Sequence, residues 1–341
     1  MKLTKRYYCL ILTVIAVLFF YAFTGIRETQ TIPKQYEIFK RIPAGNFLLF
    51  SAAPKSFFDS EFMLLMSNIA LGSSDSTLEE IETKSGEVEA MIGINPMDIE
   101  RITVFGGEPK RIGDELGAII QVNAENFYYD LLLSKFEVVQ STLLLSGYNV
   151  QMFSEGLIGS GEEIYLFHDD IEIVITTSKN MMEKTLGLKR GNGPSLADDR
   201  DFINRMYDLK YNESLWIHLP TDKIIEDVLG KVSTKKPDIL GDNFEFSSLL
   251  CGISLSSDFR LNVKIYSANE EQLTLIYDLF NGLKAVGMLS LTEYPEARKI
   301  LNVFEFKKEN DYFDIDVKIT KDDVELLLGI GKGINNKSRY K

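Results

Sequence analysis

Alternation of apolar and polar residues marks three neighbouring stretches of the chain, Asn149-Val-Gln-Met-Phe153, Glu163-Ile-Tyr-Leu-Phe167 and Ile171-Glu-Ile-Val-Ile175. This alternation is typical of a β-strand that buries one side. The connections between the stretches are the glycine-rich residues 156–161 and the tripeptide His168-Asp169-Asp170. Together they predict an antiparallel meander.

Outward from this meander, other segments show the spacing of helices and strands. Helical spacing of apolar residues predicts helices over 54–66, 78–91, 124–136, 179–188, 195–209, 221–229 and 268–283. Short apolar or alternating runs predict further strands over 47–50, 102–105, 117–122, 215–219, 261–266, 300–306 and 312–319. The last two strands form a predicted hairpin.

The second half of the chain repeats the first in the order of its predicted elements. We therefore expect an α+β protein of two related modules, 42–194 and 195–328, each an antiparallel sheet with helices packed on one face. Residues 27–41 are the expected spacer before the first module. Chance agreement of strand and helix order is the alternative to an internal duplication.

The N-terminus predicts how the chain is anchored. Residues 7–26 carry no charge, and a helix of that length spans ~30 Å, which matches the hydrocarbon core of a bilayer. Lys2, Lys5 and Arg6 precede it, which predicts a cytoplasmic segment 1–6 and a single-pass cell-membrane protein with the bulk of the chain extracytoplasmic. A cleaved signal peptide and a buried soluble helix are the competing interpretations.

Composition and charge limit the classes of function. The 341 residues are 45% apolar and 26% charged, which indicates a globular protein rather than a disordered or disulfide-stapled one. The formal net charge of −13 would repel phosphate backbones, so nucleic acid is not an expected partner.

Four short motifs are Ile42-Pro-Ala-Gly-Asn-Phe-Leu-Leu-Phe50, Gly93-Ile-Asn-Pro-Met-Asp-Ile99, Thr176-Thr-Ser-Lys179 and Ser195-Leu-Ala-Asp198. They resemble uncharacterised bacterial families of membrane-anchored envelope proteins that open with Ile/Val-Pro-Ala before a strand. Gly45 and Asn46 replace the usual Asp and Ser/Thr. The resemblance implies export and a fold with an apparent internal duplication, and it assigns no catalytic residue.

The two histidines and the cysteines are the residues most often used in catalysis. His168 abuts Asp169 and Asp170, but adjacent residues cannot all converge on one metal ion, so a hairpin turn is the better interpretation. We expect His218 to be a partly buried strand residue. Cys251 lies in an apolar run and is expected to be a small buried side chain, and Cys9 lies in the N-terminal apolar run.

No nucleotide or calcium motif is complete. Residues 156–161 lack the dinucleotide-binding order, and Gly333 stands where a phosphate-binding loop needs Ser or Thr after Lys332. Asp311, Asp314 and Asp316 lack the Gly and Glu of a calcium loop, and we expect Asp314 and Asp316 on the solvent face of a strand. The acids Asp198, Asp199 and Asp201 are explained by a helix start. The sequence therefore predicts no catalytic, cofactor-binding or metal-binding residue, and no cofactor or nucleotide.

These observations favour a non-catalytic extracytoplasmic binding or scaffolding protein of the cell envelope with a protein partner. An envelope hydrolase that uses His168 or His218, and a carrier of an apolar ligand, are the alternatives. Residues 329–341, with four cations and no acid, are expected to be a flexible basic tail.

Overall fold

The computed structural model describes residues 35–45, 48–63, 65–66, 95–106, 115–122, 140–153, 163–220, 246–292, 295–324 and 326. They divide between two compact units, which lie within Met1–Met206 and Tyr207–Lys341. The helices predicted over 78–91, 124–136 and 221–229 lie outside the described residues, as do the glycine-rich segments 156–161 and 329–341. The module limits at 42–194 and 195–328, and the duplication, stay predictions.

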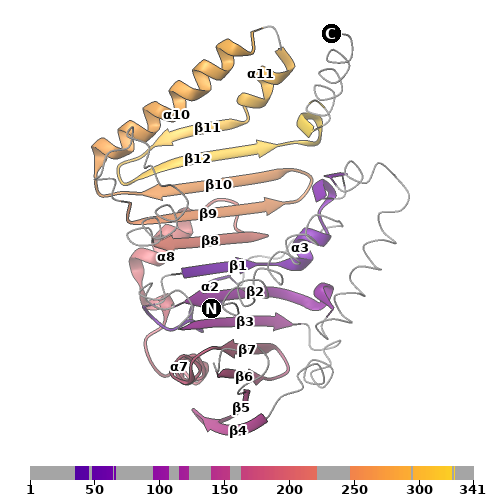
Figure 1. Cartoon of the computed structure of the whole chain (residues 1–341), viewed down its shortest axis with the longest axis vertical. Coiled ribbons are helices and arrows are strands. Elements are labelled where there is room, and N and C mark those ends of the chain that lie inside the picture. The colour runs from indigo at the N-terminus through magenta and orange to yellow at the C-terminus, as the bar shows by residue number, and fades with distance from the viewer. Residues whose placement is uncertain are drawn as a thin grey trace, which may run out of the picture. The chain divides into compact units, whose positions relative to one another are not determined.

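Seven described strands form the sheet of the first unit, and every pairing among them is antiparallel (Figure 1). Their order in space is β1 (Leu48–Ala52), β2 (Ile99–Gly106), β3 (Leu116–Val122), β7 (Glu172–Thr176), β6 (Ile164–His168), β5 (Tyr148–Phe153) and β4 (Gln140–Leu145). The predicted meander is confirmed as β5, β6 and β7. Ser146 and Gly147 both have positive φ and join β4 to β5 through a two-residue hairpin turn.

The two sides of this sheet carry different neighbours. One side holds an apolar cluster that includes Ile102, Phe153 and Ile173. The opposite side, on which Glu172 lies, meets α7 (Lys179–Lys189), which contacts β7 and β3. The Ser178 hydroxyl caps α7 by accepting a hydrogen bond from the Met181 amide at 3.2 Å. This helix therefore positions Lys189, its last residue, beside Glu172.

A second helical group in the first unit packs through aromatic rings. The short helix α2 (Gln35–Phe39) contacts η4 (Leu196–Asp198), and the rings of Phe39 and Phe202 meet edge-on with centroids 5.1 Å apart. Phe202 belongs to α8 (Arg200–Asp208). This contact holds the end of α2, and with it Arg41, beside the sheet.

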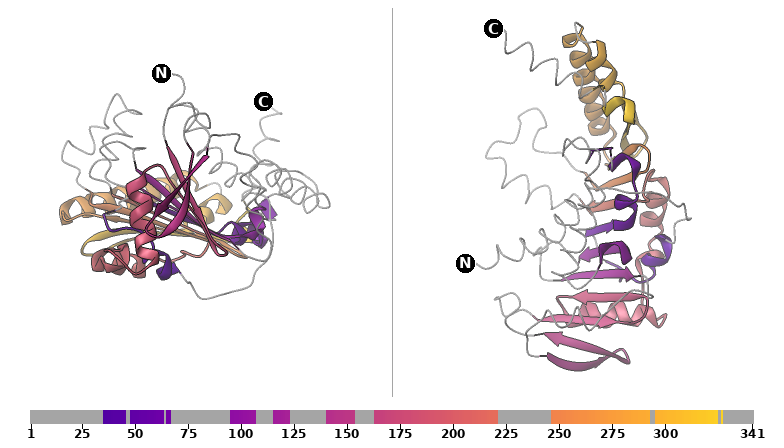
Figure 2. Two further views of the ribbon diagram at one scale, coloured as in Figure 1. Left: turned by 90° about the horizontal axis from the view of Figure 1, so that it is seen from below. Right: turned by 90° about the vertical axis from the view of Figure 1, so that its right-hand side faces the viewer.

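Five described strands form the sheet of the second unit, again with antiparallel pairing throughout. Their order is β8 (Leu215–Pro220), β9 (Ser248–Leu255), β10 (Phe259–Tyr266), β12 (Tyr312–Ile319) and β11 (Phe304–Lys308). Between β10 and β11 the chain forms α10 (Glu270–Ser290) and then α11 (Pro295–Leu301), which turns back against α10 (Figures 1 and 2).

The core of the second unit lies between α10 and one side of its sheet. Leu273 and Phe313 are fully buried there, together with Ile276, and the rings of Phe280 and Phe306 pack against Phe313. Burial of each large apolar side chain stabilises the fold by ~1.5–3 kcal/mol. Residues of β10 and β12 alternate between this apolar side and a polar side.

The predicted fold class, an α+β protein preceded by a transmembrane helix, was wrong. The described chain is built mainly from twelve antiparallel strands and has few helices. Helical spacing over 54–66 was one source of error, because α3 (Pro54–Phe58) ends at Phe58. The Ser60 hydroxyl then accepts a hydrogen bond from the Met63 amide, which begins a new turn. Two strands, β4 and β9, were also not predicted from the sequence.

The predictions of a transmembrane anchor, of a single-pass membrane location and of an extracytoplasmic envelope protein are also corrected. Among the residues that the structure describes, no helix combines the length and the apolar character needed to cross a membrane. The longest of them, α10, has 21 residues and instead covers a sheet. Residues 7–26, on which the anchor was predicted, lie outside the described residues.

Candidate functional site

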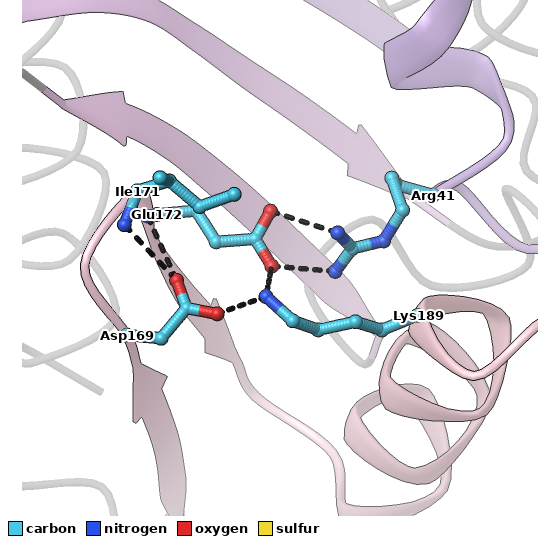
Figure 3. A network of polar contacts seen from close by, with 5 residues as sticks. All are labelled: Arg41, Asp169, Ile171, Glu172 and Lys189. Carbon is cyan, nitrogen blue, oxygen red and sulfur yellow. Dashed lines mark hydrogen bonds and ion pairs between the residues drawn. The ribbon is translucent and has the colours of Figure 1, made fainter.

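The first cluster of charged residues is centred on Glu172, at the start of β7 (Figure 3). Arg41 donates two hydrogen bonds to the Glu172 carboxylate, at 2.6 and 3.0 Å, and Lys189 donates a third at 2.7 Å. The Glu172 side chain is only 5% exposed, so both of its oxygens are occupied away from water. Paired in this way, the carboxylate is stabilised as an anion and has no oxygen left for a substrate.

Asp169 completes this cluster from the hairpin between β6 and β7. Its carboxylate accepts hydrogen bonds from the backbone amides of Ile171 and Glu172, both at 3.1 Å, and forms an ion pair with Lys189. Burial raises the pKa of Asp169, but the bonds from Lys189 and the two amides outweigh burial and leave it below its ordinary value. Asp169 is thus a turn residue, as the sequence predicted, that also holds the end of α7.

The second cluster lies on the polar side of the second unit, around Asp314. Asn262 donates to the Asp314 carboxylate at 2.5 Å, and the Lys264 ammonium lies 3.8 Å from it. Lys264 also sits 3.7 Å from the centroid of the Tyr312 ring, within the range of a cation–π contact. Burial lowers the pKa of Lys264, and the negative charge of Asp314 offsets this only in part.

A chain segment that follows α8 closes over this second cluster. Lys210 contacts Asp316 at 2.5 Å and Asp314 at 3.5 Å, and its backbone amide donates to Asn262 at 3.3 Å. The segment passes so close to the sheet that a Cβ at Gly252 would overlap the carbonyl oxygens of Lys210 and Tyr211. The expectation that Asp314 and Asp316 line a solvent face was therefore wrong: Asp314 is buried and paired.

The residues singled out in the sequence are not brought together. His168 ends β6 opposite Ile173, in the first unit, whereas His218 lies buried on β8 opposite Leu250, in the second. Cys251 lies on β9, where burial raises the pKa of its thiol to about 11. No group of three His, Cys, Asp or Glu side chains in the described part of the chain is placed to hold a metal ion.

The acids before α8 serve the helix start, as expected. Asp198 accepts hydrogen bonds from the amide and the hydroxyl of Ser195, at 2.8 and 2.9 Å, and these bonds lower its pKa. Asp199 accepts from the Phe202 amide at 3.0 Å. Both carboxylates act as helix caps.

The exposed side of α10 differs from both charged clusters, because it presents apolar side chains to solvent. Leu275 is 47% exposed, Leu283 and Val286 are each 61% exposed, and Leu289 is 75% exposed. With Leu279 and Gly282 they form a row along the helix, here called the α10 stripe: Leu275, Leu279, Gly282, Leu283, Val286 and Leu289.

Five members of the α10 stripe recur at alternating steps of four and three residues, from Leu275 to Leu289. This is the spacing of a helix surface that packs against another helix. The side that covers the sheet has its own row of apolar residues, which includes Leu273, Ile276 and Phe280. An ordinary surface helix has one such row, so α10 has one more than its own unit uses.

The α10 stripe was not predicted from the sequence, because the helix predicted over 268–283 stops short of the end of α10 at Ser290. Val286 and Leu289 therefore lay outside the predicted element. The signal is present in the chain: apolar residues repeat at helical spacing on two sides of one segment.

Comparison of the chain with protein-family models, with curated proteins and with solved structures found no match, so the resemblance drawn from short motifs gains no support from them.

Proposed function

We propose that this chain is a non-catalytic binding or scaffolding protein that engages a protein partner through the α10 stripe. The observation that carries the proposal is the contrast between this stripe and the charged clusters. The ionisable side chains around Glu172 and Asp314 bond to one another, whereas Leu283, Val286 and Leu289 face solvent. Of these three groups of described residues, the one exposed to solvent is apolar rather than ionisable.

The physical argument for a partner is the cost of leaving such a row in water. Apolar surface gains ~25 cal/mol for each Å² that is removed from water, and scattered exposed apolar residues need no explanation. A contiguous row on one helix is different, because patches of this kind mark sites of interaction with other molecules. A partner that offers its own amphipathic helix matches the spacing of the α10 stripe.

The non-catalytic part of the proposal is supported by the state of the ionisable groups. A catalytic acid, base or nucleophile has to reach the substrate. Glu172 and Asp314 are buried and hydrogen-bonded, and the Cys251 thiol has a pKa of about 11, so it is protonated at neutral pH. Held in this way, these groups stabilise the two sheets and are poorly placed to act on a substrate.

Site-specific photo-crosslinking in cells that express the full chain tests the proposal. The photoreactive residue p-benzoyl-phenylalanine replaces Val286 in the α10 stripe, and in the matched control it replaces Ile171, which is also 61% exposed but lies in the first unit. We expect a crosslinked product of defined mass from position 286 and none from position 171. The product from position 286 should disappear when Leu289→Glu is added.

Either of two results would overturn the proposal. Irradiation could give no product from position 286, or it could give the same products from positions 286 and 171. The second result would mean that crosslinking follows exposure alone.

A further inference from the structure

We infer that the partner of the α10 stripe is a second copy of this chain, and that the two α10 helices pair antiparallel about Gly282. The inference rests on the proposed function and names its partner. It follows from three features of α10: the symmetry of the stripe, the space at Gly282 and the charges at the helix start.

The stripe is self-complementary when one helix is reversed. Gly282 stands midway between Leu275 and Leu289, seven residues from each. A two-fold axis through Gly282 therefore places Leu275 of one copy opposite Leu289 of the other. The same patch then meets itself, as an interface between two identical subunits requires.

Gly282 is the member of the stripe that allows the helices to approach. A Cβ built at Gly282 meets no atom within 4 Å, so the glycine is not needed for packing inside the unit. Glycine in a helix interior lowers helix stability, and a position that carries it without an internal reason suggests an external one. A small residue at the crossing point lets the two backbones come together while the leucines fill the ends.

Charge at the helix start decides between the two possible directions. Glu270 and Glu271 are exposed in the first turn of α10. Glu270 pairs with Lys308 at 2.9 Å, so the comparison rests on Glu271. A parallel pair would bring the two Glu271 carboxylates together, whereas an antiparallel pair about Gly282 separates them by ~33 Å along the helix axis. The antiparallel arrangement therefore avoids the repulsion.

The charges also argue against a membrane surface as the occupant. Lys284 is the only cation of α10, and its ammonium donates to the Phe304 carbonyl of β11 at 2.6 Å. Glu271 and Asp278 flank the stripe as exposed acids. Helices that lie on membranes usually carry Lys and Arg on their polar face, and α10 lacks them there.

The exposed area fits a weak dimer. From the exposed fractions of Leu275, Leu283, Val286 and Leu289, the four side chains leave on the order of 300 Å² of apolar surface on each copy. Two copies together cover about 600 Å², which is below the ~1,200 Å² at which specific, stable interfaces begin, so the contact is weak. We expect a dissociation constant in the micromolar range and a dimer that dissociates on dilution.

Cysteine crosslinking in cells that express the full chain tests both the partner and the direction. Cys9→Ser and Cys251→Ala first remove the native thiols. Single cysteines are then introduced by Leu283→Cys, beside the proposed axis, by Leu275→Cys or Leu289→Cys, and by Leu144→Cys as a control at an exposed leucine of the first unit. A short bis-maleimide is added as the crosslinker. The covalent dimers are identified by their mass, and their amounts are compared.

The antiparallel pair predicts a distinct pattern. Leu283→Cys should crosslink to itself, because its two copies are ~3 Å apart along the helix axis, and Leu275→Cys should not, because its two copies are ~21 Å apart. Leu275→Cys and Leu289→Cys chains of different mass should form a mixed dimer when expressed together. Leu144→Cys should give at least tenfold less dimer than Leu283→Cys.

Three outcomes overturn the inference alone and are separable from failure of the proposed function. Absence of a Leu283→Cys dimer excludes a second copy, and dimers of Leu275→Cys with itself exclude the antiparallel direction. Photo-crosslinking from position 286 to a different protein also excludes a second copy, but it leaves the proposed function intact. Absence of any product from position 286 overturns both.

Discussion

Leu275 and Leu289 lie two heptads apart on the exposed side of α10, with Gly282 midway between them. Leu273, only two residues before Leu275, is fully buried against Phe313 on the other side of the helix. One helix thus presents apolar residues in two directions, and only one of them is used by the sheet. This relationship is the basis of the proposed binding surface.

Truncation on the two sides of α10 should have opposite consequences for folding. Leu273→Ala removes a fully buried side chain and should lower the free energy of unfolding by ~2–5 kcal/mol. Leu289→Ala should change it by less than ~0.5 kcal/mol in dilute solution. Urea unfolding followed by the fluorescence of Trp216, which is buried in the second unit, measures both. Equal losses would mean that the stripe is part of the monomer core.

Gly282→Ala should raise stability and weaken association at once. Alanine is favoured over glycine in a helix interior, and open space surrounds the new Cβ, so the free energy of unfolding should rise by ~0.5–1 kcal/mol. The same methyl group stands at the predicted crossing point and should push the two helices apart. Thermal unfolding and dilution experiments on one sample distinguish the two effects. An unchanged dissociation constant of the dimer would mean that the two α10 helices do not cross at Gly282.

Arg41→Met should strongly destabilise the first unit. It leaves the buried Glu172 carboxylate without its bidentate partner, at a cost of ~3 kcal/mol in the free energy of unfolding, measured by circular dichroism in urea. Combining Arg41→Met with Glu172→Gln should cost less than the sum of the single changes. Lys40→Met, in an exposed pair with Glu37, is the control and should cost under ~1 kcal/mol.

Acid should weaken the first unit partly through Asp169. Its folded pKa lies below the unfolded value near 4, so its stabilising effect is complete above about pH 4 and is lost as the pH falls through the folded pKa. Between about pH 5 and pH 3, Asp169→Asn should therefore lose less stability than the unaltered chain. Asp170→Asn, at an exposed neighbouring position, is the matched control for removal of one carboxylate. Identical acid profiles for all three chains would refute the role of Asp169.

The Cys251 thiol should be unreactive in the folded chain. With a pKa of about 11 it is almost entirely protonated near neutral pH, and the thiolate is the reactive form. In a chain with Cys9→Ser, a disulfide reagent should label Cys251 at least about 100-fold more slowly in buffer than in denaturant. Rapid labelling of the folded chain would show that the Cys251 thiol is accessible and reactive, which would contradict this prediction.

Local signals were sufficient for several elements of the fold. Alternation identified the three strands of the meander, and Lys179 at the start of α7 and Ser195 before η4 were placed correctly because helix starts carry their own capping chemistry. The strand predicted over 312–319 coincides with β12. These features depend on neighbouring residues, which a sequence displays directly.

Features that depend on distant residues could not be predicted in this way. Arg41 was assigned to a spacer, yet it pairs with Glu172, 131 positions away. Alternation placed Asp314 on the polar side of a strand, but whether that side faces water depends on Lys210 and its segment. The strand predicted over 300–306 began too early because α11, which starts at Pro295, extends to Leu301.

Sedimentation velocity of the full chain, from about 1 to about 100 μM, is the decisive test of a dimer formed through the α10 stripe, because this range brackets the affinity expected of an interface this small. The sedimentation coefficient of the unaltered chain should rise from the monomer toward the dimer value across the range. A chain with Leu275→Glu and Leu289→Glu should stay monomeric, while Leu144→Glu should behave like the unaltered chain. A monomer at every concentration, or a dimer that survives both substitutions in the α10 stripe, would refute this interface.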